Sequence, residues 1–358
     1  MSASLKAVSL FAGAGGMDYG ASLAGVKVLA AFDTMASAAE MYGQLLPGVP
    51  FLVEDVRSLE GLPDADLLLG GYPCQPFSSG GIRSPVSDER SNLWTEFARV
   101  LRLIQPRFFV AENVSGLRAK WSADVLQAQL EAFDAAGYQV STDLLQAADF
   151  GVPQRRRRLF IVGVHKDLKK SYRFPESTHS VNGAGGKLAW VSHGDAIAHM
   201  EAWPSGEFYE LSESSRNWPW YYMSRNRRAL WAAPAYTVVA NFRHVSLHPR
   251  SPQPVMTSSN LADGSKQTWE FQPWTERLLA DCDLPVGVEG FDQPRRLSWR
   301  ESAVLQTFPE CVEPAGSPAS KMTQIGNAVP PHLAEAVVRG LVDGSGLGPA
   351  VSDEVLPR

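Results

Sequence analysis

The first half of the chain alternates short apolar runs with stretches in which apolar residues recur at helical spacing. The apolar runs are 6–11, 26–33, 66–69 and 107–112, with a fifth at 159–164, and the helical stretches are 37–46 and 92–104. This alternation is typical of a parallel sheet with helices on its faces. We therefore expect an α/β fold with a doubly wound, mostly parallel sheet, which binds its ligands beyond the carboxyl ends of the strands.

The second half reads differently and predicts a second, smaller, irregular domain. Helical periodicity fades after Phe174, and residues 251–290 are rich in Ser, Pro, Gly and Asp, which predicts loops. Amphipathic stretches at 298–307 and 331–341 predict two late helices. We interpret the aromatic cluster at 218–222 as part of the core. The stretch 236–239 has the composition of a strand, which would hold the loops on either side of it. We expect one domain over 1–174 and 320–345, a second over 175–319, and a tail over 346–358.

Composition excludes several classes of protein. The 33 Lys and Arg against 38 Asp and Glu give a net charge of −5, which argues against a wholly basic nucleic-acid coat protein. Three cysteines are too few and too scattered for a disulfide framework or a zinc site, so no metal is expected. We see no signal peptide and no run near the ~20 apolar residues of a membrane span. A cytoplasmic protein is expected.

A glycine loop follows the first predicted strand. Phe11-Ala12-Gly13-Ala14-Gly15-Gly16 allows a tight turn and the close approach of a ligand. A dinucleotide fingerprint would continue with a glycine where Asp18 stands, which disfavours a nicotinamide cofactor and leaves another adenosine cofactor open. Asp33 lies where an acid reaches ribose hydroxyls in such folds, and Asp55 could supply a further contact.

Chemically reactive residues follow other predicted strands. Cys74 stands between two prolines, where it is either an activated thiolate nucleophile or a buried, inert cysteine. Glu112 ends the fourth strand and is a candidate acid. An arginine run at 155–158 precedes the fifth apolar run, and alternation along an extended segment would place Arg156 and Arg158 on one face.

Six sequence motifs, taken in order, resemble the cytosine-5 DNA methyltransferase family of bacterial modification enzymes. They are FAGAGG, GGYPCQPFS, ENVSGL, GVPQRRRRLFIVG, RRLSWRESAVLQTFP and QIGNAVPPHLAEAV. The resemblance implies a Rossmann-like, S-adenosyl-L-methionine-dependent fold that releases S-adenosyl-L-homocysteine, with a target-recognition region over 175–319. It also implies site-specific methylation of carbon 5 of cytosine in double-stranded DNA.

The same resemblance implies roles for individual residues. Cys74 would be the nucleophile, Glu112 would hold the target base, and Arg156 and Arg158 would support base and backbone. The cofactor site would be lined by Phe11, Gly13, Gly15, Gly16, Asp33, Thr34, Asp55, Val56, Pro73, Leu93, Asn327 and Ala328. Four positions depart from the family's usual pattern, and these departures bear on how tightly the cofactor would bind. Asp33 replaces a glutamate, Met35 a second acid, Glu54 a glycine, and Tyr72 a proline or phenylalanine.

The recognition region would bind DNA, and the free energy of these contacts would offset the cost of flipping the cytosine out of the duplex. Candidate DNA contacts are Gln75, Ser78, Arg225, Arg227, Arg228 and Arg243, which could read base edges or contact phosphates only. Residues 151–250 hold 15 Lys or Arg and 7 Asp or Glu, a local charge of +8. We expect a monomer, either paired with a cognate restriction endonuclease or acting alone. An RNA cytosine-5 methyltransferase and a catalytically inactive DNA-binding regulator are the alternatives.

Overall fold

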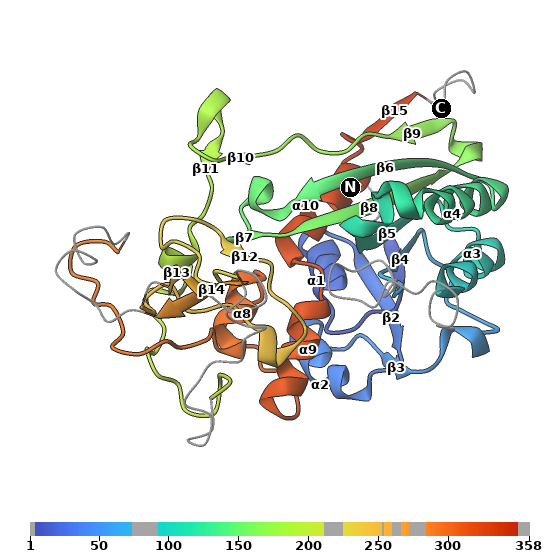
Figure 1. The fold of residues 1–358 in the computed structure, drawn as a ribbon. Helices are drawn as coiled ribbons and strands as arrows, with labels where there is room; N and C mark the ends of the chain where they lie inside the picture. The colour runs from blue at the N-terminus through green and yellow to red at the C-terminus, as the bar shows by residue number, and fades with distance from the viewer. Residues whose placement is uncertain are drawn as a thin grey trace. The chain divides into compact units, whose positions relative to one another are not determined.

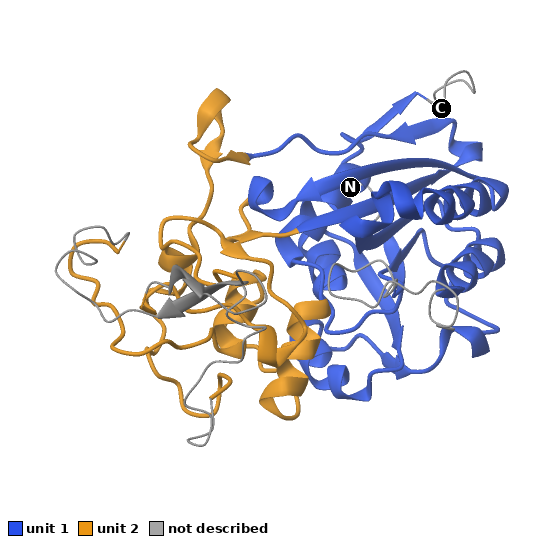
Figure 2. Ribbon diagram, viewed as in Figure 1, with its two compact units in different colours: residues 1–150, 157–178, 328–358 blue, residues 151–156, 179–327 orange. Residues whose placement is uncertain are grey.

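Two compact units make up the chain, which Figure 1 shows as a ribbon and Figure 2 colours by unit. The computed structural model describes residues 4–73, 92–210, 225–252, 254–259, 266–271 and 284–349. Unit 1 comprises 1–150, 157–178 and 328–358, and unit 2 comprises 151–156 and 179–327. The boundaries expected at 174 and 319 fall instead at 178 and 327, and residues 151–156, expected in the first domain, belong to unit 2. The roles assigned to the two domains stay predictions.

Unit 1 is built on a seven-stranded sheet of order β3-β2-β1-β4-β5-β8-β6. All neighbouring strands pair in parallel except β8, which is antiparallel to both β5 and β6. The strands are β1 (Lys6–Leu10), β2 (Lys27–Asp33), β3 (Phe51–Val53), β4 (Leu67–Gly70), β5 (Phe108–Val114), β6 (Tyr138–Gln146) and β8 (Arg157–His165). The mostly parallel, doubly wound sheet is confirmed. Its strand order reverses between β1 and β4, the point at which such sheets bind ligands.

Helices cover the sheet on the expected pattern (Figure 1). The helices of unit 1 are α1 (Gly16–Leu23), α2 (Ala39–Leu45), α3 (Leu93–Ile104), α4 (Ala123–Ala135) and α10 (Pro331–Val342). Buried aromatic rings join α3 and α4 to the sheet, with Phe97 and Phe133 both against Phe109. On α1, a side chain at Gly20 would lie 2.3 Å from the Pro331 carbonyl oxygen, so only glycine lets α10 pack so closely on α1.

A short antiparallel pair closes unit 1 near its C-terminus. β9 (Lys170–Tyr172) pairs with β15 (Leu347–Pro349), and the Tyr172 hydroxyl donates a 2.6 Å hydrogen bond to the Val337 carbonyl in α10. Burial raises the pKa of the Tyr172 phenol, so the hydroxyl stays protonated and keeps this bond at any pH the protein meets. Residues 347–349 of the segment expected to be a tail, 346–358, therefore form a strand of this two-stranded sheet.

Unit 2 has little regular structure, as expected. Its elements are β7 (Gln154–Arg155), β10 (His179–Ser180), β11 (Leu188–Ala189), α5 (His193–Ile197), β12 (Ala235–Tyr236), β13 (Pro254–Ser259), β14 (Lys266–Phe271), α8 (Trp299–Leu305) and α9 (Pro318–Asn327). β12 pairs with β7, so the strand expected at 236–239 is shorter and begins one residue earlier. The aromatic cluster at 218–222 lies outside the described residues.

One expectation for unit 2 is wrong. Residues 251–290 were expected to be loops, but β13 and β14 form an antiparallel pair within them, from Pro254 opposite Phe271 to Ser259 opposite Lys266. Each strand is six residues long and includes β-branched or aromatic residues. Composition averaged over forty residues hid them among the polar residues around them.

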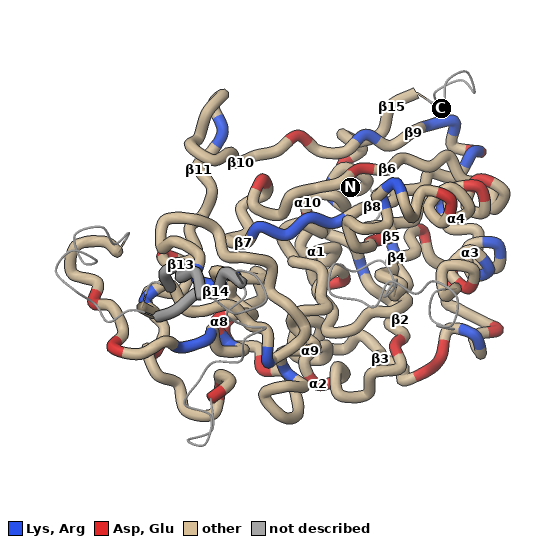
Figure 3. The backbone as a smooth tube through the Cα atoms, viewed as in Figure 1, with Lys and Arg blue, Asp and Glu red and all other residues tan. Residues whose placement is uncertain are grey.

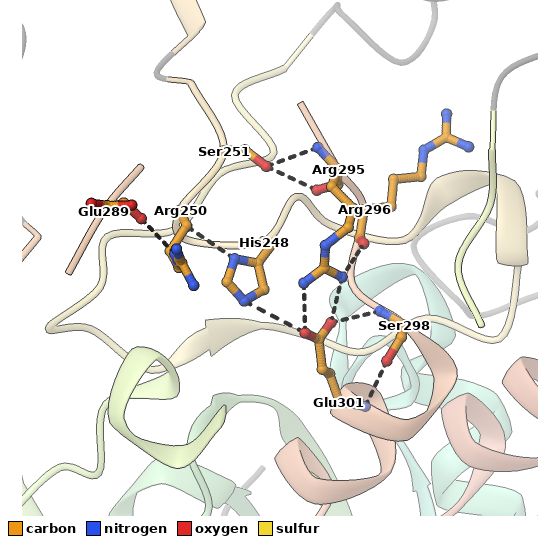
Figure 4. A network of polar contacts seen from close by, with 8 residues as sticks. All are labelled: His248, Arg250, Ser251, Glu289, Arg295, Arg296, Ser298 and Glu301. Carbon is orange, nitrogen blue, oxygen red and sulfur yellow. Dashed lines mark hydrogen bonds and ion pairs between the residues drawn. The ribbon is translucent and has the colours of Figure 1, made fainter. Parts of the chain in front are cut away.

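A buried ion pair anchors α8 in unit 2 (Figure 4). Both terminal nitrogens of Arg295 donate to the Glu301 carboxylate, at 2.9 and 2.7 Å, and neither side chain is more than 1% exposed. Glu301 also accepts from the Ser298 backbone N–H, and the Ser298 hydroxyl accepts from the Glu301 N–H, which caps the helix. Removing one partner of such a pair costs about 3–5 kcal/mol, because it leaves a buried charge.

His248 lies beside this ion pair without carrying a charge. Its Nε2 lies 3.5 Å from the Glu301 carboxylate, and its Nδ1 accepts from the Arg250 backbone N–H. Burial, assisted by Arg295, holds the pKa of His248 well below its ordinary value. The RRLSWRES motif therefore serves, in this structure, to fix one helix of unit 2.

Candidate active site

The glycine loop after β1 is tied to the end of β2 by Asp33. One carboxylate oxygen of Asp33 accepts the Gly13 backbone N–H and the other accepts the Met35 N–H, both at 2.7 Å. Gly15 has φ 83°, a left-handed conformation that favours glycine. A side chain at Gly13 would meet no atom within 4 Å, so the loop leaves open space on that side. This open loop beside a carboxylate fits the ribose and backbone contacts of an adenosine cofactor.

A buried carboxylate that the sequence did not single out as functional lies beneath the loop. Asp18, which is fully buried on α1, accepts hydrogen bonds of 2.7 Å from the Ser9 hydroxyl on β1 and the Tyr42 hydroxyl on α2. The Tyr42 ring lies against Gly15, where an added side chain would be 2.8 Å from it. In the sequence, Asp18 served only to show that the third glycine of a dinucleotide fingerprint is absent. Its position after a strand and next to glycines gave no sign of this contact with Tyr42.

Burial raises the pKa of the Asp18 carboxyl to about 6, despite the hydrogen bonds from Ser9 and Tyr42. Because the folded state keeps a proton that the unfolded chain releases, the free energy of unfolding falls as pH rises towards that value. Asparagine cannot ionise. We therefore expect Asp18→Asn to gain about 1–2 kcal/mol of stability relative to the wild type between pH 5 and pH 8. Urea unfolding of both proteins at the two pH values measures this, and a difference that is constant with pH would contradict it.

Asp55 and Val56 lie in the turn that follows β3. Arg57 binds the Asp55 carboxylate through Nε and Nη2, and these hydrogen bonds lower the pKa of Asp55. Val56 is buried, and its carbonyl accepts a hydrogen bond from Arg99. Thr34 is exposed after β2, and Leu93 is half-buried at the start of α3. Their contacts with a cofactor stay predictions.

The segment after β4 brings the third strand end to the same edge. The Tyr72 hydroxyl donates to the Gln129 side chain at 2.7 Å, and the Tyr72 carbonyl accepts from the Asn113 side chain at 3.2 Å. Its ring also meets Phe11 edge-on, at 6.5 Å between centroids. The described chain reaches Pro73 here, so Cys74, Gln75 and Ser78 lie outside the described residues.

Glu112 on β5 forms an ion pair with Arg158 on β8. The Arg158 Nε lies 2.7 Å from Glu112 Oε1, and the two side chains are 15% and 10% exposed. Burial lowers the pKa of Arg158, and the neighbouring Glu112 partly offsets that effect. Burial favours the protonated form of a carboxyl group, but the ion pair with Arg158 favours the charged carboxylate in the protein without its ligands. The pair holds one carboxylate at the edge to which β1, β2 and β4 also lead.

Arg156 has a different environment from Arg158. It is 1% exposed, belongs to unit 2, and donates to the carbonyls of Val238 and Gly326, both at 2.9 Å. The expectation that alternation places it with Arg158 is not met, because β7 ends at Arg155 and β8 begins at Arg157. Figure 3 shows this run as a continuous basic segment. A catalytic role for Arg156 stays a prediction.

The candidate DNA-reading arginines of unit 2 differ in exposure. Arg225 and Arg243 are exposed and Arg227 is half-buried. Arg228 is 3% exposed and its Nε donates to the Ser251 carbonyl at 2.9 Å, so little of its side chain is open to DNA. Asn327, exposed, ends α9 in unit 2, and Ala328, buried, begins the last segment of unit 1. Roles for these six residues stay predictions.

Two other features are absent from the described residues. No group of three or more His, Cys, Asp or Glu side chains is placed to hold a metal ion in the ranges listed above. Within the same residues, no helix combines the length and apolar character needed to cross a membrane.

Comparison with known families and proteins gives one consistent result. The family model described as C-5 cytosine-specific DNA methylase matches residues 5–343. The type II methyltransferase M.BspRI of Lysinibacillus sphaericus is 34% identical over 373 residues, which cover 93% of this chain and 80% of the relative. M.BsuRI of Bacillus subtilis is 32% identical over 93% of this chain and 78% of its own length.

Solved structures agree with the fold. A DNA modification methyltransferase encoded within an E. coli prophage superposes with a TM-score of 0.65 at 21% identity, over 95% of this chain and 99% of the other. The Dnmt2 methyltransferase of S. pombe gives a TM-score of 0.62 at 20% identity over the same shares.

Proposed function

The chain belongs to the C-5 cytosine-specific DNA methylase family, and from this premise we propose that it methylates carbon 5 of a cytosine at a specific site in double-stranded DNA. The observation that carries the proposal is the Glu112–Arg158 pair, held at the strand edge where the Tyr72-Pro73 segment leads into Cys74. Named relatives are type II methyltransferases, so the protein is proposed as the modification enzyme of a type II restriction-modification system.

S-adenosyl-L-methionine would supply the methyl group. Asp33 is proposed to bind its ribose, while the loop from Phe11 to Gly16 approaches the rest of the cofactor through backbone atoms. Asp33 is one methylene shorter than the usual glutamate, and it already accepts the Gly13 and Met35 N–H groups. Each carboxylate oxygen has a second lone pair, so a ribose hydroxyl can still donate to it.

Cys74 is proposed to attack carbon 6 of the cytosine through its sulfur. A carbon–sulfur bond forms, and the electron pair of the 5,6 double bond makes carbon 5 a nucleophile that takes the methyl group. Glu112 is proposed to take up a proton once the cytosine is bound and to donate it in a hydrogen bond to ring nitrogen 3, where negative charge develops, with Arg158 fixing its orientation. Loss of the carbon 5 proton to water then expels the Cys74 thiolate and restores the ring.

Unit 2 is proposed to bind the duplex. A stacked base cannot reach Cys74, so the cytosine must be flipped out at a cost of a few kcal/mol, which DNA contacts offset. The exposed residues Arg225 and Arg243 are the better candidates for these contacts than buried Arg228. A monomer suffices for one cytosine, and a cognate endonuclease is proposed as the biological partner.

Methyl transfer to DNA tests this proposal directly. The purified protein is incubated with S-adenosyl-L-methionine and plasmid DNA, and bisulfite sequencing reports the methylated cytosines. We expect one short sequence context to be methylated and others to be left unmodified. A parallel reaction with labelled methyl donor and tRNA separates the RNA alternative. Label in tRNA and none in DNA would favour an RNA methyltransferase, and label in neither would favour the inactive regulator.

A further inference from the structure

We propose that Tyr72 is a positioning residue for methyl transfer, because its hydroxyl contact with Gln129 fixes the backbone that leads into Cys74. We call this contact the tyrosine anchor. The inference rests on the proposed function, since it names what holds the proposed nucleophile in place. The family's usual residue at this position is proline or phenylalanine, and neither has a hydroxyl, so the anchor departs from that pattern.

The tyrosine anchor joins the segment after β4 to the buried face of α4. The Tyr72 hydroxyl donates a 2.7 Å hydrogen bond to Gln129 Oε1, and both side chains are at most 2% exposed. The Tyr72 ring packs on Phe97 of α3, at 5.6 Å between centroids, and meets Phe11 of the glycine loop edge-on. One side chain therefore contacts α3, α4 and the glycine loop, all of them in unit 1.

The backbone of Tyr72 is held as well as its side chain. Its carbonyl accepts a 3.2 Å hydrogen bond from the side chain of Asn113, which is buried next to Glu112 on β5. The preceding residue also lies near the site, because a side chain added at Gly71 would be 3.6 Å from Glu112 Oε2. The segment that leads to Cys74 thus runs beside Glu112, and two hydrogen bonds fix it at Tyr72.

The sequence leaves little conformational freedom between Tyr72 and Cys74. Pro73 is the one residue between them, and its ring restricts its own φ to about −65°. The residue before a proline is also restricted, to extended conformations. A rotation of the Tyr72 backbone is therefore passed on to Cys74, and a displacement of about 1 Å at a reacting group can cost about 100-fold in rate.

The composition of the anchor favours positioning over stability as its role. Gln129 Nε2 is buried and has no hydrogen-bond partner in the part of the chain that the structure describes. A buried donor without a partner destabilises the folded state, whereas two apolar side chains of the same shape would avoid this. A hydrogen bond, unlike apolar packing, also depends on direction. The Tyr72–Gln129 pair therefore supplies orientation at some cost in stability.

Tyr72→Phe tests the anchor, because it removes the hydroxyl and keeps the ring. Steady-state and single-turnover kinetics are measured on a duplex that bisulfite sequencing shows to be methylated. We expect kcat to fall about 10- to 100-fold. The KM values for DNA and for S-adenosyl-L-methionine should stay at the wild-type values, because a misplaced thiolate impairs the chemical step and not the binding. A wild-type kcat, or a loss that appears only in KM, would overturn the positioning role.

A double variant separates positioning from stability. Tyr72→Phe alone leaves the Gln129 side chain buried without its partner, so it should also lower the urea concentration at the midpoint of unfolding. Tyr72→Phe/Gln129→Leu removes both polar groups, and its midpoint should return to the wild-type value or exceed it. Its kcat should stay as low as in the single variant. A wild-type kcat in the double variant would show that instability caused the loss, and would overturn the anchor.

Tyr138→Phe is the matched control. Tyr138 is a buried tyrosine of unit 1 whose hydroxyl donates a 2.8 Å hydrogen bond to the Pro106 carbonyl, just before β5 begins and at the opposite edge of the sheet. This variant should lower the urea midpoint and keep the wild-type kcat. Equal losses of kcat in Tyr72→Phe and Tyr138→Phe would overturn the anchor while methylation of DNA by the wild type still stands. A wild-type protein that methylates no DNA would overturn the proposed function, and the anchor with it.

Discussion

Replacement of Cys74 by serine is expected to abolish methyl transfer while the protein still binds DNA. A thiolate attacks carbon 6, and a serine hydroxyl stays protonated at neutral pH and is a far weaker nucleophile. The rate should fall by about 10⁴-fold or more, as when the nucleophile of another covalent enzyme is removed. Transfer of labelled methyl groups measures the rate, and gel shift measures the binding.

Cys311→Ser is the matched control for this variant. Cys311 is an exposed free cysteine of unit 2, so its replacement changes the same atom without touching the proposed site. It should keep wild-type activity. A Cys74→Ser protein that methylates DNA at the wild-type rate would rule out covalent catalysis by this residue.

Glu112→Gln is expected to lower kcat by about 10²–10⁴-fold, because a neutral amide cannot supply the proton or the charge-assisted hydrogen bond at ring nitrogen 3. The same change also leaves Arg158 without its ionic partner. Because the two side chains are only 15% and 10% exposed, this leaves a largely buried charge unpaired. Part of any loss of activity could then come from a destabilised fold. Single-turnover kinetics measures the chemical step, and urea unfolding measures the stability.

The double variant Glu112→Gln/Arg158→Gln separates these two effects. It removes both charges, so the buried-charge penalty disappears and stability should recover towards the wild type. Activity should not recover, since the acid is still absent. If the double variant regained the wild-type rate, Glu112 would have only a structural role.

The parts of the site that depend on strand ends could be predicted from the sequence. Parallel strands bring their carboxyl ends to one edge, so Phe11, Asp33, Tyr72 and Glu112 were expected together. The structure links them by the Gly13–Asp33 hydrogen bond, the Phe11–Tyr72 ring contact and the Asn113–Tyr72 hydrogen bond. Periodicity also predicted α3 and α10 nearly to the residue.

Contacts between side chains far apart in the chain could not be predicted. Tyr42 binds Asp18 across 24 positions, and Gln129 binds Tyr72 across 57, and neither pair has a local signature. The arginine run shows a related limit. Alternation assumes one continuous strand, and the break at Arg156 gives that residue carbonyl partners in unit 2 while Arg158 pairs with Glu112. A single sequence does not reveal such a break.

The packing of α1 against α10 bears on how the protein is made in the cell. The helix that follows the glycine loop is synthesised early, but its partner is the last helix that the structure describes, and Gly20 and Pro331 meet almost in backbone contact. During translation, the apolar face of α1 that packs on α10 stays exposed until nearly all of the remaining chain has been synthesised. Such surfaces attract chaperones and aggregation. A chain that lacks α10 leaves this face of α1 exposed to water.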